Sequence, residues 1–210
     1  MHIGILGSGL MGAKLGTIFA GKGHDVVFSY ARKQSKLDRL ARQAGGNARA
    51  GSVAEAAHQE VVLLAIHWSR LGDVLRQAGD LAGRVVVTCS LPMSKGDSRL
   101  VIARTSSGAE ALQKKRPKAR VVSAFGTVPS EVFFPLLKAR PSKKPSLLYC
   151  SGDQKAKRVA AQLIEDVGFD PVDAGPLENA RLLEPLALLN IRLAFVEKLG
   201  NEIGFKLLHP

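Results

Sequence analysis

Short apolar runs alternate along the chain with longer segments in which apolar residues recur every three or four positions. The apolar runs are typical of buried strands and lie at residues 1–7, 25–30, 48–50, 60–66, 84–89 and 120–125. The segments of helical spacing lie at residues 10–21, 33–45, 52–57, 71–78 and 106–115. Ser52 and Glu55 have the spacing of a capping box at the start of the third helix. This order predicts a doubly wound, mainly parallel α/β sheet.

The pattern changes character after residue 125. Residues 129–145 contain four prolines and several basic residues, and we expect an irregular connection or flap there. Beyond it the pattern predicts two more strands and two more helices, at residues 146–152, 154–167, 169–175 and, as a long apolar helix, 177–199. We therefore predict a dinucleotide-binding domain over 1–125 and a small C-terminal α/β domain over 126–210.

A glycine motif follows the first predicted strand directly and opens the first predicted helix. Its residues are Gly7, Ser8, Gly9, Leu10, Met11 and Gly12. In the Rossmann arrangement the first glycine makes a tight turn, the second lets a pyrophosphate approach the backbone, and the third lets helix and strand pack closely. Free N–H groups at a helix start also attract an anion. The motif is either a glycine turn that only packs or a nucleotide cradle, and its context favours the cradle.

The end of the second predicted strand indicates which nucleotide binds. Sites for NAD usually have an acidic residue there, whereas this chain has basic and hydroxyl residues: Ser29, Tyr30, Arg32, Lys33, Ser35 and Lys36. Arginine and lysine suit a 2′-phosphate, and the serine hydroxyls are candidate donors to it. Cations at a helix start are unfavourable without an anionic partner. We therefore expect NADP(H).

Residues at the carboxyl ends of the next two strands should face the nucleotide. Ala65, Ile66, His67 and Trp68 follow the strand at 60–66, and Cys89 ends the one after it. His67 is either a general acid or base or a structural residue, and Trp68 either packs in the loop or contacts the nicotinamide. Cys89 has no adjacent base that would activate it. We predict no catalytic residue and no metal site.

The composition is that of an ordinary globular protein, with 210 residues of which 46% are apolar. No apolar run approaches the roughly 20 residues that span a bilayer. The apolar start lacks a basic leader region and is interrupted by glycines, so it does not resemble a signal peptide. Two cysteines are too few for a disulfide framework or a metal cluster. We expect a cytoplasmic protein without a membrane partner.

The net charge of +12 is concentrated in the middle of the chain. Residues 95–158 hold 15 Lys and Arg against 4 Asp and Glu, a net +11. The densest run, KKRPKAR at 114–120, is either a patch for a phosphate backbone or a solvated helix end and turn. Because no aromatic residues for base stacking interleave with it, we favour the second interpretation and expect no nucleic-acid partner.

Several stretches together resemble the NADPH-dependent 8-hydroxy-5-deazaflavin reductase family, to whose wider group the animal metalloreductases belong. They include GILGSGLMG (4–12), SYARKQSK (29–36), VLLAIHW (62–68), VVSAFGTVP (121–129) and DAGPLENARLLEPLALLNI (173–191). The resemblance covers essentially the whole chain. It implies a homodimer that transfers a hydride between NADPH and a deazaflavin, with residues 126–210 completing the acceptor cleft. It implies that the acceptor pocket is lined by Phe125, Gly126, Thr127, Val128 and Pro129.

One position departs from the pattern of this family. Members that use a deazaflavin often have a histidine where this chain has Gly126. A glycine opens space and removes a donor, so a deazaflavin, a flavin, a quinone-like compound or a small metal chelate all remain candidate acceptors. Two alternatives stay open. One is an NADP(H)-binding sensor or partner subunit without turnover. The other is an imine reductase of the pyrroline-carboxylate type, which needs a longer, all-helical C-terminal domain.

Overall fold

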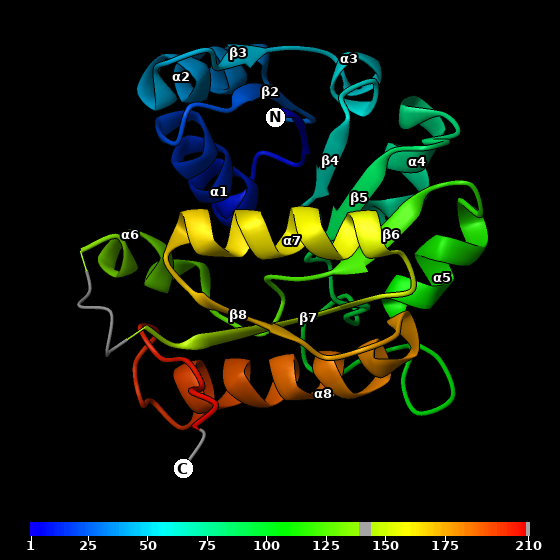
Figure 1. The fold of residues 1–210 in the computed structure, drawn as a ribbon, viewed down its shortest axis with the longest axis vertical. Coiled ribbons are helices and arrows are strands. Elements are labelled where there is room, and N and C mark those ends of the chain that lie inside the picture. The colour runs from blue at the N-terminus through cyan, green and yellow to red at the C-terminus, as the bar shows by residue number, and fades with distance from the viewer. Residues whose placement is uncertain (139–143, 209–210) are drawn as a thin grey trace.

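The computed structural model describes residues 1–138 and 144–208. Eight strands form one sheet in the order β3-β2-β1-β4-β5-β6-β7-β8 (Figure 1). Neighbouring strands run parallel except β6 and β7, which pair antiparallel. The strands are β1 His2–Leu6, β2 Asp25–Ser29, β3 Arg49–Ala50, β4 Val61–Leu64, β5 Val85–Thr88, β6 Arg120–Ser123, β7 Ser146–Ser151 and β8 Asp170–Asp173. The predicted doubly wound α/β sheet is confirmed.

With the exception of α6, the helices also lie where the spacing of apolar residues predicts them. They are α1 Leu10–Gly21, α2 Gln34–Ala44, α3 Val53–Ala57, α4 Leu71–Ala78, α5 Gly108–Lys115, α6 Phe133–Leu136, α7 Gln154–Val167 and α8 Ala180–Ile191. The capping box is present at α3, where the Ser52 hydroxyl accepts from the Glu55 N–H and the Glu55 carboxylate accepts from the Ser52 N–H. None of the helices in the described part of the chain is long and apolar enough to cross a membrane.

Two apolar layers hold the helices against the sheet. On one face, side chains of α1, α2 and α7 pack with Ile3 and Ile5 of β1. On the other face, side chains of α3, α4 and α5 pack with Leu6 of β1 and Leu64 of β4. A smaller cluster, which includes Leu183, joins α8 to α5 and β7. Both faces of the central strands are thus covered, which is why these strands are apolar throughout.

The described part of 129–145 is more regular than the expected irregular flap. A 3₁₀ turn over Ser130–Val132 leads into the one-turn helix α6. Phe133 anchors α6 because its fully buried ring packs edge-on against Phe125 and Phe169, with centroids 6.3 and 6.1 Å apart. This aromatic packing overrides the turn-forming tendency of the prolines. Residues 139–143 lie outside the described residues.

The C-terminal third continues the same sheet. Strands β7 and β8 add to its edge, and α7 packs across β5, β6, β7 and β8. The long helix predicted at 177–199 begins as a 3₁₀ turn at Leu177–Asn179, continues as α8 and ends as a π-helical turn at Arg192–Val196. The predicted boundary at 125/126 falls between β6 and β7, so it divides strands of one sheet and stays a prediction.

Candidate functional site

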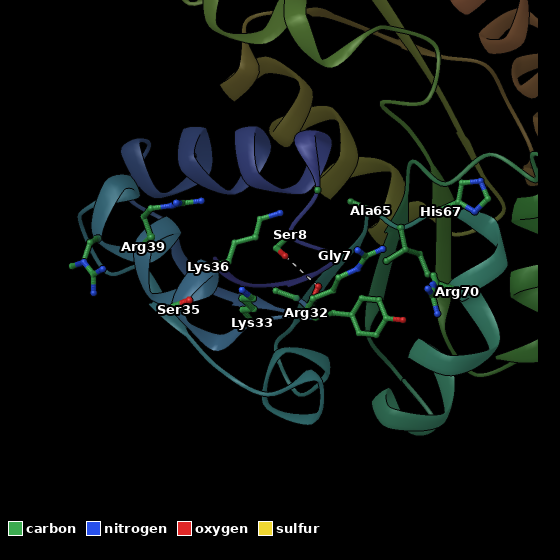
Figure 2. A pocket seen from close by; sticks show the side chains of 15 residues that line it. Gly7, Ser8, Arg32, Lys33, Ser35, Lys36, Arg39, Ala65, His67 and Arg70 are labelled. Atoms are coloured by element: carbon green, nitrogen blue, oxygen red, sulfur yellow. Dashed lines mark hydrogen bonds between the residues drawn. The ribbon is translucent and has the colours of Figure 1, made fainter. Parts of the chain in front are cut away.

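A cavity of about 750 Å³ opens at the carboxyl ends of β1, β2 and β4 (Figure 2). Ten of the residues predicted to contact a nucleotide line it: Gly7, Ser8, Gly9, Tyr30, Arg32, Lys33, Lys36, Ala65, Ile66 and His67. Ser35, which we expected as a hydroxyl donor, also lines it. Three cations that we did not predict complete its charged wall: Arg39, Arg42 and Arg70. The structure thus brings three separate segments of the chain together around one cavity.

The three glycines of the motif differ in what a side chain would meet at each position. Gly7 has a φ of +120°, and a Cβ there would overlap the carbonyl oxygen of Ala65. A Cβ on Gly12 would overlap the carbonyl oxygen of Gly7, so this glycine lets α1 pack on the end of β1. Gly9 differs, since a Cβ there would meet nothing within 4 Å. The backbone of Gly9 therefore faces open space that a ligand can approach.

The start of α1 has backbone N–H groups that an anion can bind. Gly9 occupies the N-cap position and brings no capping side chain, and the first turn of α1 holds no acidic residue. The N–H groups of a first helical turn need partners, and a pyrophosphate supplies them. The Gly7 N–H donates to the Ser29 carbonyl (3.3 Å) and the Ser8 hydroxyl donates to the Tyr30 carbonyl (3.2 Å), which fixes the loop against the end of β2. The chain therefore fits a dinucleotide at this place.

The basic wall follows the loop after β2 and one face of α2. Figure 2 shows Lys36 extending from α2 toward the start of α1, and Arg32 extending toward the cavity beside Ala65. The other cations of this wall are Lys33, Arg39 and Arg42. Among the ion pairs of the described residues, none involves any of these five side chains. Their charges are therefore available to an anionic ligand.

Tyr30 is a rigid part of the cavity wall. It adopts a φ of +59°, which is uncommon for a residue other than glycine. Its hydroxyl donates to Asp73 Oδ2 on α4 (2.7 Å). Burial, followed by the bond to Asp73, raises the pKa of the Tyr30 phenol, while the same hydrogen bond lowers the pKa of the Asp73 carboxyl. The pair fixes the tyrosine ring between the basic wall and α4.

His67 is held through both of its ring nitrogens. Nε2 lies 2.9 Å from Asp97 Oδ1 and Nδ1 lies 2.8 Å from the Ser69 hydroxyl. The ring thereby joins the end of β4 to the loop around Asp97. Trp68 does not line the cavity, and its partly buried ring packs on the apolar cluster of α3, α4 and α5. This geometry matches the structural interpretation of both residues, and an acid–base role of His67 stays a prediction.

Besides Trp68, five residues predicted to contact the nucleotide do not line the cavity. Ser29 corrects our expectation, whereas a contact of Cys89 with the nucleotide stays a prediction. The Ser29 hydroxyl is fully buried and donates to the Ile5 carbonyl (2.8 Å), so it cannot donate to a 2′-phosphate. The Cys89 thiol lies against the Leu64 carbonyl, and burial raises its pKa to about 12. The others belong to the first turn of α1 and contribute backbone or packing: Leu10, Met11 and Gly12.

The loop predicted to line an acceptor pocket is mostly buried. Phe125 is fully buried, has a φ of +63°, and packs between Phe19 and Phe133 with centroids 6.4 and 6.3 Å away. Val128 and Pro129 are buried as well. Their side chains belong to the core, which corrects the expectation that all five loop residues face a ligand.

Gly126 is the least buried residue of this loop. A Cβ at this position would lie 3.4 Å from Leu91 Cδ2 and 3.7 Å from the Cys89 carbonyl oxygen, which are ordinary contacts. Because its φ lies outside the left-handed region, a side chain here causes no backbone strain. The backbone at position 126 therefore does not require glycine, and it could carry a larger side chain such as histidine.

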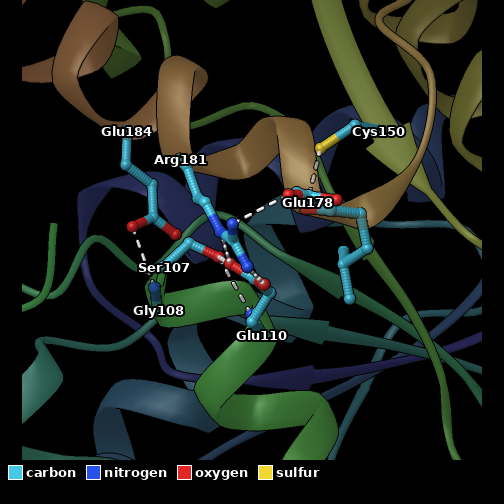
Figure 3. A network of polar contacts seen from close by, with 8 residues as sticks. Ser107, Gly108, Glu110, Cys150, Glu178, Arg181 and Glu184 are labelled. Carbon is cyan, nitrogen blue, oxygen red and sulfur yellow. Dashed lines mark hydrogen bonds and ion pairs between the residues drawn. The ribbon is translucent and has the colours of Figure 1, made fainter. Parts of the chain in front are cut away.

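The motif at 173–191 proves to be a docking element. Arg181 on α8 donates twice to Glu110 on α5, from Nε to Oε2 (2.9 Å) and from Nη2 to Oε1 (2.6 Å), and its third nitrogen binds Glu178 (Figure 3). One turn along, the buried Glu184 accepts from the N–H groups of Gly108 and Ala109 at 2.9 and 3.0 Å. These contacts join α8 to the start of α5, and none of these residues lines the nucleotide cavity.

The basic run at 114–120 is a helix end and turn, as we favoured. Lys114 and Lys115 occupy the last turn of α5, where cations are favourable. The Arg116 guanidinium donates to the carbonyl oxygens of Gly79 and Leu75 at 2.7 and 2.6 Å. This arginine therefore closes the C-terminal end of α4.

The N-terminal part of the chain, which lines the cavity, is similar in sequence to a known family. Residues 2–92 match the family model described as NADP oxidoreductase coenzyme F420-dependent. The matched segment contains the glycine loop, the basic wall and the end of β4, and the match supports NADP(H) as the nucleotide. The metalloreductase STEAP3 of Rattus norvegicus is 30% identical over 190 residues, which is 89% of this chain and 37% of that protein. The chain therefore spans well under half the length of this relative.

Solved structures resemble the fold over nearly all of the chain. A protein of Arthrobacter sp. FB24, provisionally described as an F420-dependent NADP reductase, superposes with a TM-score of 0.87 at 24% identity and covers 100% of both chains. An imine reductase of Streptomyces aurantiacus superposes with a TM-score of 0.65 at 20% identity, covering 94% of this chain and 64% of that one. At these identities the likeness shows a shared Rossmann-like fold.

Proposed function

We propose that the chain is an NADP(H)-dependent oxidoreductase that transfers a hydride between NADPH and a planar acceptor. The observation that carries this proposal is the row of unpaired cations beside the glycine loop, five side chains that face one cavity without an ion pair among the described residues. Unpaired cations this close together repel one another unless an anion joins them. A 2′-phosphate bound by Arg32, Lys33 and Lys36 supplies that anion, and the pyrophosphate occupies the start of α1.

The chain's own residues bind and orient the reactants in this reaction. The Gly9 backbone and the first turn of α1 hold the pyrophosphate, and Tyr30, fixed by Asp73, and Arg70 form the opposite wall. NADPH supplies the hydride when it is bound. Hydride transfer depends on proximity and orientation of the two rings more than on acid–base groups. The paired nitrogens of His67 agree with a positioning role at the end of β4.

The proposed acceptor is a deazaflavin, a flavin or a similar planar compound that binds beside Gly126. This residue is the partly exposed point of the loop after β6, and it lies near the Cys89 carbonyl at the end of β5. Ligands of such sheets bind at these carboxyl ends. The family match to F420-dependent oxidoreductases supports a deazaflavin in particular. The net +11 over residues 95–158 favours an acceptor with acidic groups.

A panel of acceptors tests the proposal. Purified protein is mixed with NADPH, and absorbance at the nicotinamide band is followed with deazaflavin, riboflavin, FMN, FAD, quinones and ferric chelates in turn. The ferric chelates are included because one relative is a metalloreductase. We expect steady oxidation of NADPH with a planar acceptor. Tight binding of NADPH without oxidation by any acceptor would instead support a sensor or partner subunit, the alternative without turnover.

The imine-reductase alternative is the less favoured one. The imine reductase that superposes has more than a third of its length outside the match. In this chain the residues after 145 form two strands that extend the sheet, together with α7 and α8, in place of an all-helical domain. An imine substrate added to the same panel tests this alternative, and we expect no oxidation of NADPH with it.

We also propose that the chain forms a homodimer through α8 and the residues that follow it. Large apolar side chains are exposed there, a pattern that marks association surfaces: Leu182, Leu189, Phe195, Val196 and Leu199. Light scattering at several protein concentrations tests this proposal. We expect the mass of two chains for the wild type and of one chain after Leu182→Glu with Leu189→Glu, whereas a monomeric wild type would contradict the proposal.

A further inference from the structure

A carboxyl group is buried beneath the proposed acceptor loop. Glu184 is 3% exposed and projects from α8, where both of its oxygens accept backbone N–H groups at the start of α5. The same side chain lines a small cavity, about 10 Å³ in volume, between α8 and the end of β6. A cavity of this volume has room for one water molecule.

An unpaired hydroxyl lines the same small cavity. Thr127 belongs to the proposed acceptor loop and is 4% exposed, and its Oγ1 has no hydrogen-bond partner among the described residues. A buried hydroxyl without a partner is costly, and an internal water commonly satisfies such a group. The Asn190 amide holds the Thr127 carbonyl (2.8 Å) and so keeps this residue at the cavity. Ser123 supplies a third polar side chain, and the rest of the lining is mainly apolar.

The surroundings of Glu184 accommodate both of its protonation states. Burial favours the neutral acid and raises the pKa of this carboxyl to about 7, and the Glu110 carboxylate adds to the shift. The Gly108 and Ala109 N–H groups act in the opposite direction because they stabilise the carboxylate. Arg181 neutralises Glu110, and the nearby Cys150 thiol stays protonated because its pKa is raised to about 12. Such a balance near neutral pH is what a proton carrier needs.

We propose that Glu184 is a positioning residue that stores a proton for acceptor reduction, and that one water in the small cavity connects it to the Thr127 hydroxyl of the acceptor loop. This inference rests on the proposed function, since it needs an acceptor beside Gly126. It assigns a role to two buried polar residues that the nucleotide cavity does not use.

The step balances as follows. The C4–H bond of the dihydronicotinamide breaks, the hydrogen moves with its electron pair to the acceptor, and NADPH is oxidised. The reduced acceptor also takes up one proton. That proton leaves the Glu184 carboxyl through the water and the Thr127 hydroxyl, which passes on its own proton and receives the one from the water. The carboxylate left behind is held by the Gly108 and Ala109 N–H groups and regains a proton from solvent after product release.

Thr127→Val and Thr127→Ser form a matched pair of variants that tests the relay. Valine keeps the shape of the side chain and removes the hydroxyl, whereas serine keeps the hydroxyl. We expect the wild type to lose rate above about pH 7, because Glu184 is then deprotonated. We expect Thr127→Val to lower kcat for acceptor reduction about tenfold or more, to leave the Kd for NADPH unchanged, and to lack this loss of rate above about pH 7. Thr127→Ser should keep the wild-type rate and pH profile. Equal rates and profiles for wild type and Thr127→Val would overturn the proposal, as would equal losses in both variants.

A second readout separates failure of the relay from failure of the proposed function. If none of the tested acceptors supports oxidation of NADPH by the wild type, the proposed function fails. Glu184 is then titrated by NMR of carboxyl-labelled glutamate. We expect its pKa near 7 in the wild type and a shifted pKa in Thr127→Val, because the water loses a partner. The same pKa in both would contradict a water shared by the two residues. Glu184→Gln identifies the NMR signal of the Glu184 carboxyl. If that variant does not fold, the comparison of Thr127→Val with Thr127→Ser still tests the proposal.

Discussion

Arg181 and Glu110 face each other as a two-pronged pair that fastens α8 to α5, with Nη2 2.6 Å from Oε1 and Nε 2.9 Å from Oε2. Paired hydrogen bonds of this kind are stronger and more specific in geometry than single ones. The hydrogen bond from Arg181 is the main cause of the lowered pKa of Glu110. The most distinctive motif of the sequence is therefore explained by packing between helices.

Removing this arginine should destabilise the fold. Arg181→Ala leaves Glu110 partly buried without its main partner, so we expect a lower urea midpoint of unfolding. The lowered pKa of Glu110 means that its contribution is present above its unfolded pKa, near 4.5, and is lost as the pH falls through the folded value. The midpoint difference between wild type and Arg181→Ala should therefore shrink below about pH 4. Arg76→Ala, which breaks an exposed pair with Asp73, is the control, and an equal effect of both variants would contradict the docking role.

Gly9 and Gly12 should respond differently to the same substitution. Gly9→Val places a side chain in open space where the pyrophosphate approaches, so it should abolish NADPH binding and cost only about 1 kcal/mol of stability from the N-cap. Gly12→Val places its Cβ against the Gly7 carbonyl, so it should cost several kcal/mol, on the order of an overpacked core. Titration calorimetry and urea unfolding measure the two effects. Normal NADPH binding by Gly9→Val would mean that this loop holds no nucleotide.

Stability should depend on pH through Glu184. Its folded pKa of about 7 lies above the unfolded value of 4.5, so the folded state binds the proton more tightly and stability falls as the pH rises through this window. The decline should amount to roughly 3 kcal/mol between pH 4.5 and 7. Urea unfolding at several pH values measures it, with Glu184→Gln as the variant that lacks this component. A free energy of unfolding that changes in the same way in both proteins would show that Glu184 titrates normally.

Position 126 should accept a histidine. The Cβ of such a residue makes only ordinary contacts, and the backbone there is not strained. We expect Gly126→His to change the free energy of unfolding by less than about 1 kcal/mol and to shift the acceptor preference toward deazaflavin. Gly126→Ala is the matched control, which fills the Cβ position without adding a donor. Equal acceptor preference in the two variants would show that the loop residue does not choose the acceptor.

The sequence predicts most of the fold because apolar runs and glycines mark its elements. The bounds of α1 and α7 agree with the prediction, since each ends at a glycine or just before one. Helix α6 was missed because the prolines of residues 129–145 indicate turns, and only tertiary packing of Phe133 reveals the anchor. The strand at Asp170–Asp173 and the one at Ser146–Ser151 extend the main sheet, which the spacing of apolar residues could not tell.

The candidate site was predictable where the residue types and their spacing along the chain indicate a ligand, as at the glycine loop and the basic residues after β2. Arg39 was missed although it lies three residues after Lys36, on the same face of α2, so helical spacing from Lys36 was the signal for it. Ser29 was misjudged because the sequence does not show that its hydroxyl turns inward to the Ile5 carbonyl. Phe125 was misjudged for a similar reason, since its positive φ turns the ring into the core.

The most direct test of the central claim compares NADPH with NADH in the wild type and in Arg32→Ala. Each Kd is measured by calorimetry, with Arg76→Ala as a control for the loss of a surface charge outside the cavity. We predict that wild type prefers NADPH and that Arg32→Ala weakens NADPH binding roughly 10- to 100-fold, the effect of one charged hydrogen bond, with little change for NADH. Equal weakening for both nucleotides, or no preference for NADPH in the wild type, would contradict the claim that this basic wall binds a 2′-phosphate.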